Sequence, residues 1–394
     1  MKKITNFLKN SPNLQPKLLL VVIAVLCGSI VTIVLMAQNR VGSLTNLSTS
    51  LEEQLAQVGQ DLNDLKSQDQ YIINQNLAAT ISAVESTYQQ SVEIYEDLLT
   101  LQDQSDDTAD LEKLFAQTLT YLSELNYASA SATLDTMSAG IQAEFNRIAT
   151  EFVIPQAAVA DNNPPGAGFR QQRVSTGIGD YLVSIITVDL NSARAIVDTA
   201  SDSDCTNDCP VLSLGEYAGR SGAFAGINGS YFCPASYPSC AGKTNTFDTL
   251  AMNKNKHYFN SDNNVYSTVP AVIFSGNSAR FVGQSLEWGR DTGVDAVLAN
   301  QPMLVSGGNV VFGGDGDPKK GSKAGRSFVG ATGSTAYIGV VHSATVAESA
   351  VAVQAMGIQY AINLDSGGST ALWYNGYKVG PGRNLPNVLL FVNK

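Results

Sequence analysis

The sequence predicts an α+β protein: a strand-rich, mixed-sheet domain with a strand-helix-strand unit follows a transmembrane helix and an α-helical, coiled-coil-like stalk. Three patterns support this class: an uncharged apolar run, apolar residues spaced three and four apart, and short alternating runs separated by Gly and Pro. We expect a cytoplasmic N-terminus at residues 1–17 and a transmembrane helix at 18–37. A helical stalk or hairpin at 41–152 and a linker at 153–173 lead to the strand-rich domain at 174–394.

The charge is unevenly distributed along the chain. Residues 41–160 carry three basic and 18 acidic side chains, whereas residues 161–394 carry 16 basic and 17 acidic ones. No segment has the basic face that nucleic-acid binding requires. We therefore expect no nucleic-acid partner.

Residues 18–37 are long enough as a helix to cross a bilayer core of roughly 30 Å. Four lysines precede the run and Arg40 alone follows it closely, so the positive-inside rule places the N-terminus in the cytoplasm. The sequence thus predicts a single-pass protein of the cell membrane with its C-terminal domain outside the cytoplasm. A cleaved signal peptide is the alternative, but the run is long for its apolar region.

The cysteines agree with an extracytoplasmic domain. Cys27 lies in the expected anchor, which leaves Cys205, Cys209, Cys233 and Cys240 as an even set. Short separations favour the pairs Cys205–Cys209 and Cys233–Cys240, although cross-pairing is left open. A four-cysteine zinc site competes with two disulfides, but the spacing differs from that of zinc ribbons, and we expect no metal.

The stalk is predicted from an apolar seam that continues as far as Tyr95. Its first part consists of Leu44, Leu47, Leu51, Leu55, Val58, Leu62 and Leu65. A polar break at 102–110 precedes another expected helix, over 111–148. Self-association through the seam is compatible with this pattern, as is a folded-back hairpin.

Beyond the linker, short strands are expected at 181–190, 194–197, 223–232, 294–298, 303–305, 309–312, 337–341, 360–364 and 370–374. A helix between the strands at 337 and 360 is marked by a capping box, Thr345 with Glu348, and by Gly357 at its C-terminus. If these two strands are parallel neighbours, their crossover is right-handed. Asn375-Gly376 predicts a hairpin.

Candidate chemistry is restricted by the scarcity of histidine. With only His257 and His342, sites that need several histidines are excluded, and neither a G-x-S-x-G nor a phosphate-binding P-loop motif is present. Carboxylates, amides, arginine and backbone donors remain, and no cofactor is expected.

Four short motifs combine such groups with glycine turns or strand ends. They are Gly226–Phe232, Asn300–Pro302, Gly325–Gly330 and Asn363–Ser369. In this order they resemble the phosphodiester glycosidase family over residues 175–394. The sequence departs from the family pattern at Ser230, Ser327 and Ser366.

The resemblance implies hydrolysis of a sugar-1-phosphodiester at its anomeric bond, in an envelope glycopolymer or exopolysaccharide. It implies Asp365 as base or nucleophile and Arg326 as a phosphate clamp. The expected substrate-binding residues are Asn228, Gly229, Asn363, Gly367, Gly368 and Ser369. Structural roles compete: Asp365 as a turn cap, Arg326 as an ion-pair partner and Asn228 as a turn residue. The competing functions are a noncatalytic glycopolymer-binding envelope module and a structural protein-pairing stalk.

Overall fold

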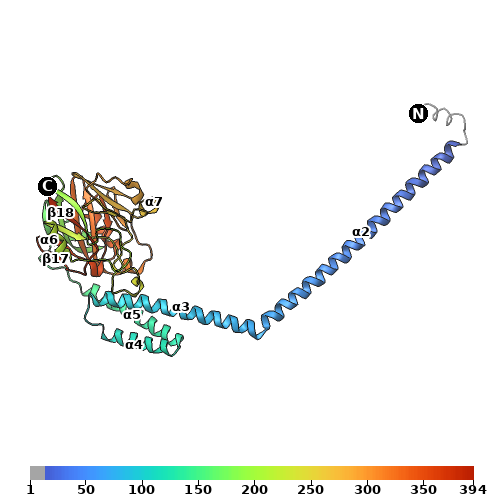
Figure 1. Cartoon of the computed structure of the whole chain (residues 1–394), viewed down its shortest axis with the longest axis horizontal. Helices are drawn as coiled ribbons and strands as arrows, with labels where there is room; N and C mark the ends of the chain where they lie inside the picture. Colours follow the sequence, from blue (N-terminus) through green and yellow to red (C-terminus); the bar gives the residue numbers. More distant parts are fainter. Residues whose placement is uncertain (1–13) are drawn as a thin grey trace. The chain divides into compact units, whose positions relative to one another are not determined.

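The computed structural model describes residues 14–394, and the chain forms two compact units, up to Val84 and Glu85–Lys394 (Figure 1). Each unit is described by itself. Most of the expected cytoplasmic segment, including Lys2, Lys3 and Lys9, lies outside the described residues.

The first unit consists of helix α2, Leu14–Ser67, and the beginning of helix α3, Asp69–Gln102. Helix α2 is long and apolar enough to cross a membrane, and none of its apolar window is buried within the protein. It continues without a break from the expected anchor into the expected stalk. Leu44, Leu55 and Leu65 of the seam are exposed. Self-association through them stays a prediction.

Three helical segments pack together in the second unit: the end of α3, helix α4, Ala109–Ser123, and helix α5, Tyr127–Glu151. Their shared core consists of Ile94, Leu98, Leu101, Leu134, Met137, Ile141 and Phe145, at helical spacings of three and four. The single helix expected over 111–148 is wrong. Leu125 adopts a left-handed conformation (φ 59°), and Asn126 caps α5 by accepting a hydrogen bond from Ser129 N at 3.2 Å.

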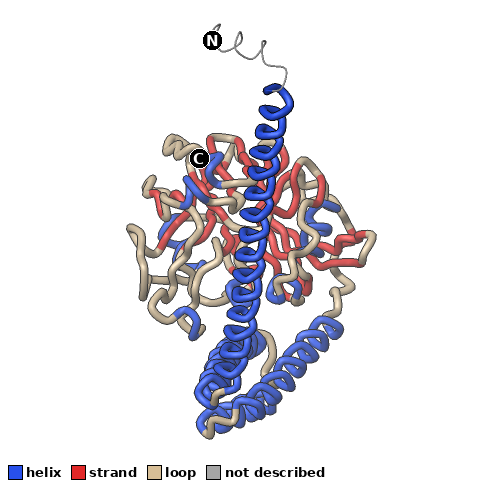
Figure 2. The backbone as a smooth tube through the Cα atoms, turned by 90° about the vertical axis from the view of Figure 1, so that its right-hand side faces the viewer, coloured by secondary structure: helices blue, strands red, loops and turns tan. Residues whose placement is uncertain are grey.

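The strands of the second unit form three sheets (Figure 2). The eight-stranded sheet, in spatial order, contains β1 Val159–Ala160, β2 Gly168–Thr176, β3 Gly179–Asp189, β14 Thr335–Ala344, β13 Ala324–Thr332, β15 Tyr360–Asn363, β11 Met303–Ser306 and β12 Asn309–Val310. The β1–β2 pair is parallel and the others are antiparallel. The expected mixed-sheet α+β class is confirmed.

Two five-stranded sheets complete the domain. One contains β17 Tyr377–Val379, β16 Leu372–Tyr374, β5 Ala225–Asn228, β18 Asn387–Asn393 and β4 Ala193–Thr199. The other contains β7 Tyr258–Phe259, β6 Ala251–Met252, β10 Ala296–Ala299, β8 Ala271–Ser275 and β9 Ser278–Val282. The remaining helices are α6 Leu214–Ser221, α7 Asn263–Tyr266, α8 Pro318–Gly321 and α9 Val346–Ala355, with 3-10 turns η1 Pro238–Cys240, η2 Ser285–Trp288 and η3 Gly367–Ser369.

The main core lies where the three sheets meet, because alternate residues of each strand point to opposite faces. Ile186 of β3 and Ile338 of β14 face this core, whereas Ile185 and Val341 face a second core that includes α9. The eight-stranded sheet is therefore buried on both faces, which holds the loop after β15 on a rigid support.

Helix α9 has the expected capping box, with Thr345 Oγ1 accepting from Glu348 N and Glu348 accepting from Thr345 N. It joins β14 to β15 as predicted. These two strands are parallel but not neighbours, because β13 lies between them and pairs antiparallel with both. The expected Asn375-Gly376 hairpin joins β16 to β17. Strand β2 begins at Gly168, inside the segment expected to be a linker.

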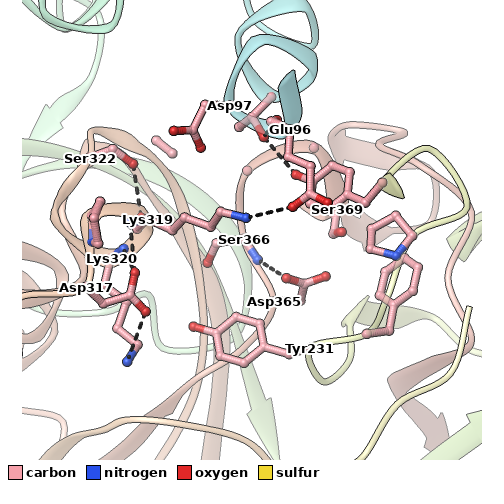
Figure 3. Close-up of a pocket in the computed structure, with 18 of the residues that line it drawn as sticks. Glu96, Asp97, Tyr231, Asp317, Lys319, Lys320, Ser322, Asp365, Ser366 and Ser369 are labelled. Carbon is pink, nitrogen blue, oxygen red and sulfur yellow. Dashed lines mark hydrogen bonds and ion pairs between the residues drawn. The ribbon is translucent and has the colours of Figure 1, made fainter. Parts of the chain in front are cut away.

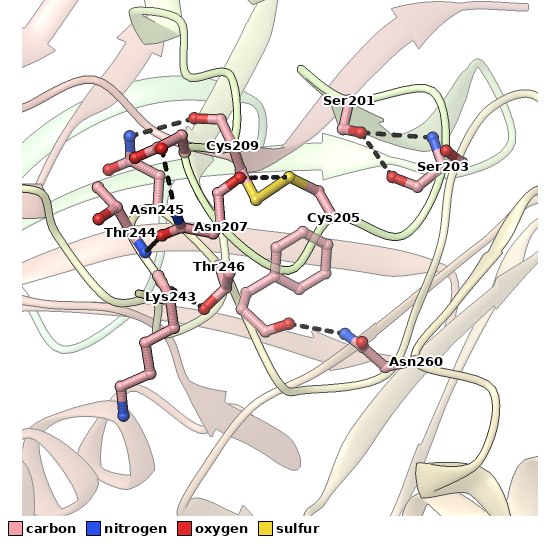
Figure 4. The surroundings of a disulfide bond; sticks show 12 residues. Ser201, Ser203, Cys205, Asn207, Cys209, Lys243, Thr244, Asn245, Thr246 and Asn260 are labelled. Atoms are coloured by element: carbon pink, nitrogen blue, oxygen red, sulfur yellow. Dashed lines mark hydrogen bonds between the residues drawn. A yellow bond between two sulfur atoms is a disulfide. The ribbon is translucent and has the colours of Figure 1, made fainter. Parts of the chain in front are cut away.

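The two expected disulfides, Cys205–Cys209 and Cys233–Cys240, are present. Figure 4 shows the first disulfide beside residues 243–246, which lie just after the second. Cys209 N donates to Thr244 O at 3.1 Å, and Cys233 N donates to Thr246 O at 2.8 Å. One segment thus links both disulfide loops.

Candidate active site

The candidate site is built around the loop that follows β15. Asp365 is the second residue after this strand, and both its backbone N–H and its backbone carbonyl are hydrogen-bonded. Asp365 N donates to Gly229 O at 3.0 Å, and Asn228 Nδ2 donates to Asp365 O at 2.6 Å. The structure thereby brings together two of the four motifs, which lie far apart in the sequence.

Asn228 and Gly229 lie on the buried side of this loop and hold its backbone. Asn228 is fully buried, and its Oδ1 accepts from Ser327 Oγ at 2.8 Å and from Ala371 N at 3.1 Å. A Cβ on Gly229 would lie 1.9 Å from Asn387 Oδ1, so only glycine fits there. Neither residue lines the pocket that contains Asp365. Their contacts favour positioning of the loop over direct binding of a sugar.

The loop itself forms a tight turn around the Asp365 carboxylate. Gly367 has a φ of +64°, which glycine adopts at little cost, and residues Gly367–Ser369 form η3. Ser366 N donates to Asp365 Oδ1 at 2.9 Å, and the Ser369 side chain also hydrogen-bonds the carboxylate. The expected glycine turn therefore places backbone and hydroxyl donors beside the acid.

Asp365, Gly367, Gly368, Ser369 and Arg326 line one pocket of about 400 Å³ (Figure 3). This volume lies in the range typical of small-molecule sites. Figure 3 shows Tyr231 and Asp365 on one side of the pocket, with Lys319 extending above them. Five of the eight expected catalytic and substrate-binding residues thus share a cavity.

Burial raises the pKa of the Asp365 carboxyl to about 6. The hydrogen bonds from Ser369 and Ser366 and the charges of Arg383 and Arg326 oppose this rise without cancelling it. With a pKa of about 6, roughly nine-tenths of the group is ionised at pH 7. Asp365 is therefore available near neutral pH as a base or nucleophile.

Arg326 lies in the pocket wall and is almost fully buried. Its Nε donates to Ala344 O at 3.0 Å, and its Nη2 donates to Lys319 O at 2.8 Å and also to Ser322 O. Burial lowers the pKa of its guanidinium, which remains charged. Nη2 thus anchors the 318–322 segment and Nε the end of β14, and within the described chain only Nη1 of this guanidinium makes no hydrogen bond.

Arg383 is a pocket cation that the sequence motifs did not single out. Its Nη2 pairs with Asp103 Oδ2 at 2.6 Å, and its guanidinium lies 5.5 Å from the Tyr237 ring centroid. Burial by itself would lower the pKa of Arg383, but Tyr237 and Asp103 raise it overall. The Gly380-Pro-Gly turn before Arg383 is the sequence signal that marks a rigid position here.

Asn363 does not line the pocket itself but contacts two residues that do, Tyr231 and Gln301. Asn363 is fully buried, and its Nδ2 donates to Tyr231 Oη at 2.7 Å. Because Tyr231 Oη accepts this bond, its own proton is free to point into the pocket. Burial, together with the negative charge of Asp365, raises the pKa of Tyr231, so its hydroxyl stays protonated. Tyr231 lay within a recognised motif, but no role was expected for it.

A comparison with protein families identifies one family for the part of the chain that contains the Asp365 loop. Residues 221–392 match the family model described as phosphodiester glycosidase, which confirms the resemblance for that part of the chain.

Solved structures that are similar to this chain include the following two. The catalytic domain of zebrafish N-acetylglucosamine-1-phosphodiester alpha-N-acetylglucosaminidase, auto-inhibited by pro-peptide, has 12% identity and a TM-score of 0.43. The match covers 61% of this chain and 87% of that one. A hypothetical protein from Synechocystis has 12% identity and a TM-score of 0.40, with coverage of 57% of this chain and 62% of that one. No curated protein matched the sequence.

Proposed function

We propose that this protein is a membrane-anchored, extracytoplasmic hydrolase that cleaves the glycosidic bond of a sugar-1-phosphodiester in an envelope glycopolymer or exopolysaccharide. The observation that carries the proposal is Asp365, whose carboxylate lies in a pocket beside backbone donors and cations. The family match at residues 221–392 supports a glycosidase-type reaction.

In the proposed reaction, the bond between the anomeric carbon and the phosphate oxygen breaks, and one water molecule is consumed. Asp365 either deprotonates the attacking water or attacks the anomeric carbon itself, after which water releases the sugar. The leaving phosphomonoester is a weak base, so it needs less help from a general acid than an ordinary sugar alcohol. The products are a free sugar and a phosphomonoester.

The other pocket residues are assigned by their chemistry. Gly367, Gly368 and Ser369 supply backbone donors to the phosphate, together with the positive charges of Arg383 and Arg326, while the Ser369 hydroxyl keeps its hydrogen bond to Asp365. Asn228 and Gly229 hold the Asp365 loop in place. Asn363 orients the Tyr231 hydroxyl, which in turn donates to the substrate.

Location outside the cytoplasm is supported by two observations. Helix α2 is long and apolar enough to serve as an anchor, and the second unit contains two disulfides, which persist in oxidising compartments. The lysines before the apolar run and Arg40 after it favour a cytoplasmic N-terminus.

The second candidate is a noncatalytic glycopolymer-binding envelope module that uses the same pocket. It is favoured by Arg326, because this expected phosphate clamp donates mainly to backbone carbonyls. Binding without turnover would fit such a protein.

Turnover by the full-length chain in detergent separates the two functions. The substrates are alkyl esters of several sugar 1-phosphates, and the assay measures release of free sugar and of phosphomonoester. Hydrolysis by the wild type is expected. Calorimetric binding of the same compounds, with neither product formed, would overturn the enzyme proposal and leave the binding module.

A further inference from the structure

One wall of the pocket comes from helices that precede the matched family region. Figure 3 shows Glu96 and Asp97 across the pocket from Tyr231 and Asp365. The lining residues from these helices and from the turn after α3 are Glu96, Asp97, Thr100, Gln104, Gln142 and Phe145. The segment expected to act as a stalk therefore contributes directly to the candidate active site.

Helix α3 is held against this pocket by polar contacts about one helical turn apart. These are Glu96 Oε1 with Ser239 N at 3.0 Å, Thr100 Oγ1 with Tyr237 Oη at 2.7 Å, and Asp103 Oδ2 with Arg383 Nη2 at 2.6 Å. Spacings of four and three residues place Glu96 and Thr100 on one face of α3, and Asp103 follows on the same side in the turn that ends the helix. The wall is thus attached both to the Cys233–Cys240 disulfide loop and to the turn before Arg383.

Asp97 differs from these anchoring residues. It lines the pocket and is partly exposed, yet it makes no hydrogen bond or ion pair with any residue from 14 to 394. Burial raises the pKa of its carboxyl, and the charge of Lys319 only partly opposes this rise. An ionised carboxylate can accept several hydrogen bonds, so donors from a pocket ligand would complete its surroundings.

The distribution of charge indicates which part of a ligand Asp97 meets. Arg326 and Arg383 line the pocket with the Asp365 loop, where a phosphate is stabilised. A second carboxylate would repel that phosphate but can accept hydrogen bonds from neutral hydroxyl groups. Glu96 is already occupied by Ser239 N and by Lys319, whose Nζ lies 3.6 Å from its Oε2. Of the two described carboxylates that line this wall, Asp97 is therefore the one left free to accept hydrogen bonds from a ligand.

We propose that Asp97 is a specificity-determining residue that accepts hydrogen bonds from sugar hydroxyls of the bound sugar-1-phosphodiester. This inference rests on the proposed function and deepens it. The helices then complete the substrate site rather than merely carry the domain, and discrimination among sugars depends on a residue outside the matched family region.

The test compares full-length wild type with Asp97→Asn and Asp97→Ala in detergent. The probes are methyl esters of glucose 1-phosphate and of its 2-, 3-, 4- and 6-deoxy analogues. Glu93→Gln is the matched control, because Glu93 is an exposed acid one turn earlier on α3 and does not line the pocket. Thermal melts of each variant check that the fold is retained.

We expect wild type to lose about tenfold or more in kcat/KM on one deoxy analogue, through KM, since a hydrogen bond to a charged group is broken. On the parent ester, both Asp97 variants should show the same loss in kcat/KM, with kcat within about threefold of the wild-type value. On the deoxy analogue that lacks the contacted hydroxyl, their kcat/KM should fall no further. The control should match wild type. Variants that keep wild-type KM, or that discriminate among the analogues as wild type does, overturn the inference.

Failure of the proposed function remains distinguishable from failure of this inference. If wild type binds the esters without turnover, calorimetry replaces kinetics. The sugar contact is then supported if Asp97→Ala binds the parent ester more weakly than wild type does and binds one deoxy analogue no more weakly than the parent ester. Catalysis is refuted in that case. If wild type neither binds nor hydrolyses any member of this panel or any of the alkyl esters of the other sugar 1-phosphates, both proposals are overturned.

Discussion

Replacing Asp365 by Asn tests both the electrostatics and the chemistry of the site. The change removes the charge but keeps the side-chain shape and an acceptor for Ser366 N. The folded pKa of Asp365, about 6, exceeds the ordinary value of 3.8 because the carboxyl is buried. Its stabilising contribution is therefore complete below pH 3.8 and is lost as the pH rises through about 6.

The asparagine variant does not titrate, so its stability relative to wild type should increase with pH. With pKa values of 3.8 unfolded and about 6 folded, the difference in unfolding free energy grows by about 2 kcal/mol between about pH 4.5 and about pH 8. This corresponds to roughly 4 °C in melting temperature for a domain of this size. Both tryptophans, Trp288 and Trp373, lie in the second unit, so intrinsic fluorescence follows its unfolding.

The same variant should lose turnover by about 10²–10⁴-fold, which is the range for removal of an acid-base group. Loss of activity together with a stability gain that rises with pH is the expected combination. Near-normal turnover would refute the catalytic role. A stability difference that stays constant from about pH 4.5 to about pH 8 would refute the assigned burial of the charge.

Three further predictions follow from the same contacts. The kcat/KM of wild type should rise with pH and level off above an apparent pKa of about 6, because the ionised form of Asp365 is required; a flat profile over pH 5–8 would contradict this. Tyr231→Phe should lower kcat about tenfold or more with little change in melting temperature, and unchanged kinetics would remove its proposed donor role. Asp198→Asn should show the opposite pH trend in stability to Asp365→Asn. Burial would raise the pKa of Asp198, but its ion pairs with Arg220 and Lys254 outweigh burial and lower it. Thermal melts should therefore show that the substitution destabilises the protein more near pH 7 than near pH 3.

Local features of the chain could be predicted because each depends on neighbours close in sequence. The Thr345–Glu348 capping box, the Asn375-Gly376 hairpin and the two short disulfide loops are all present. The single helix expected over 111–148 failed, since one left-handed residue, Leu125, interrupts an otherwise continuous apolar pattern.

The site residues were recognised from motifs, but their contacts came from elsewhere in the chain. Asn228, expected to bind sugar, is fully buried and forms hydrogen bonds with Asp365, Ser327 and Ala371. Arg326, expected to clamp phosphate, donates mostly to backbone carbonyls. The roles of both residues remain proposals. For Asn228, the contacts favour positioning of the Asp365 loop over direct binding of a sugar.

The sequence by itself determined the apolar span, the α+β class, the cysteine pairing it favoured and the Asp365 loop, because periodicity, turn chemistry and short loop closure act over a few residues. Only the tertiary structure decided which side chains face the pocket. Asp97 and Arg383 meet the Asp365 pocket through packing of α3 against distant loops, and no local pattern records such contacts. The residue type decides which hydrogen bonds and charges a side chain can offer. The fold decides which of them are used within the protein and which remain free for a ligand.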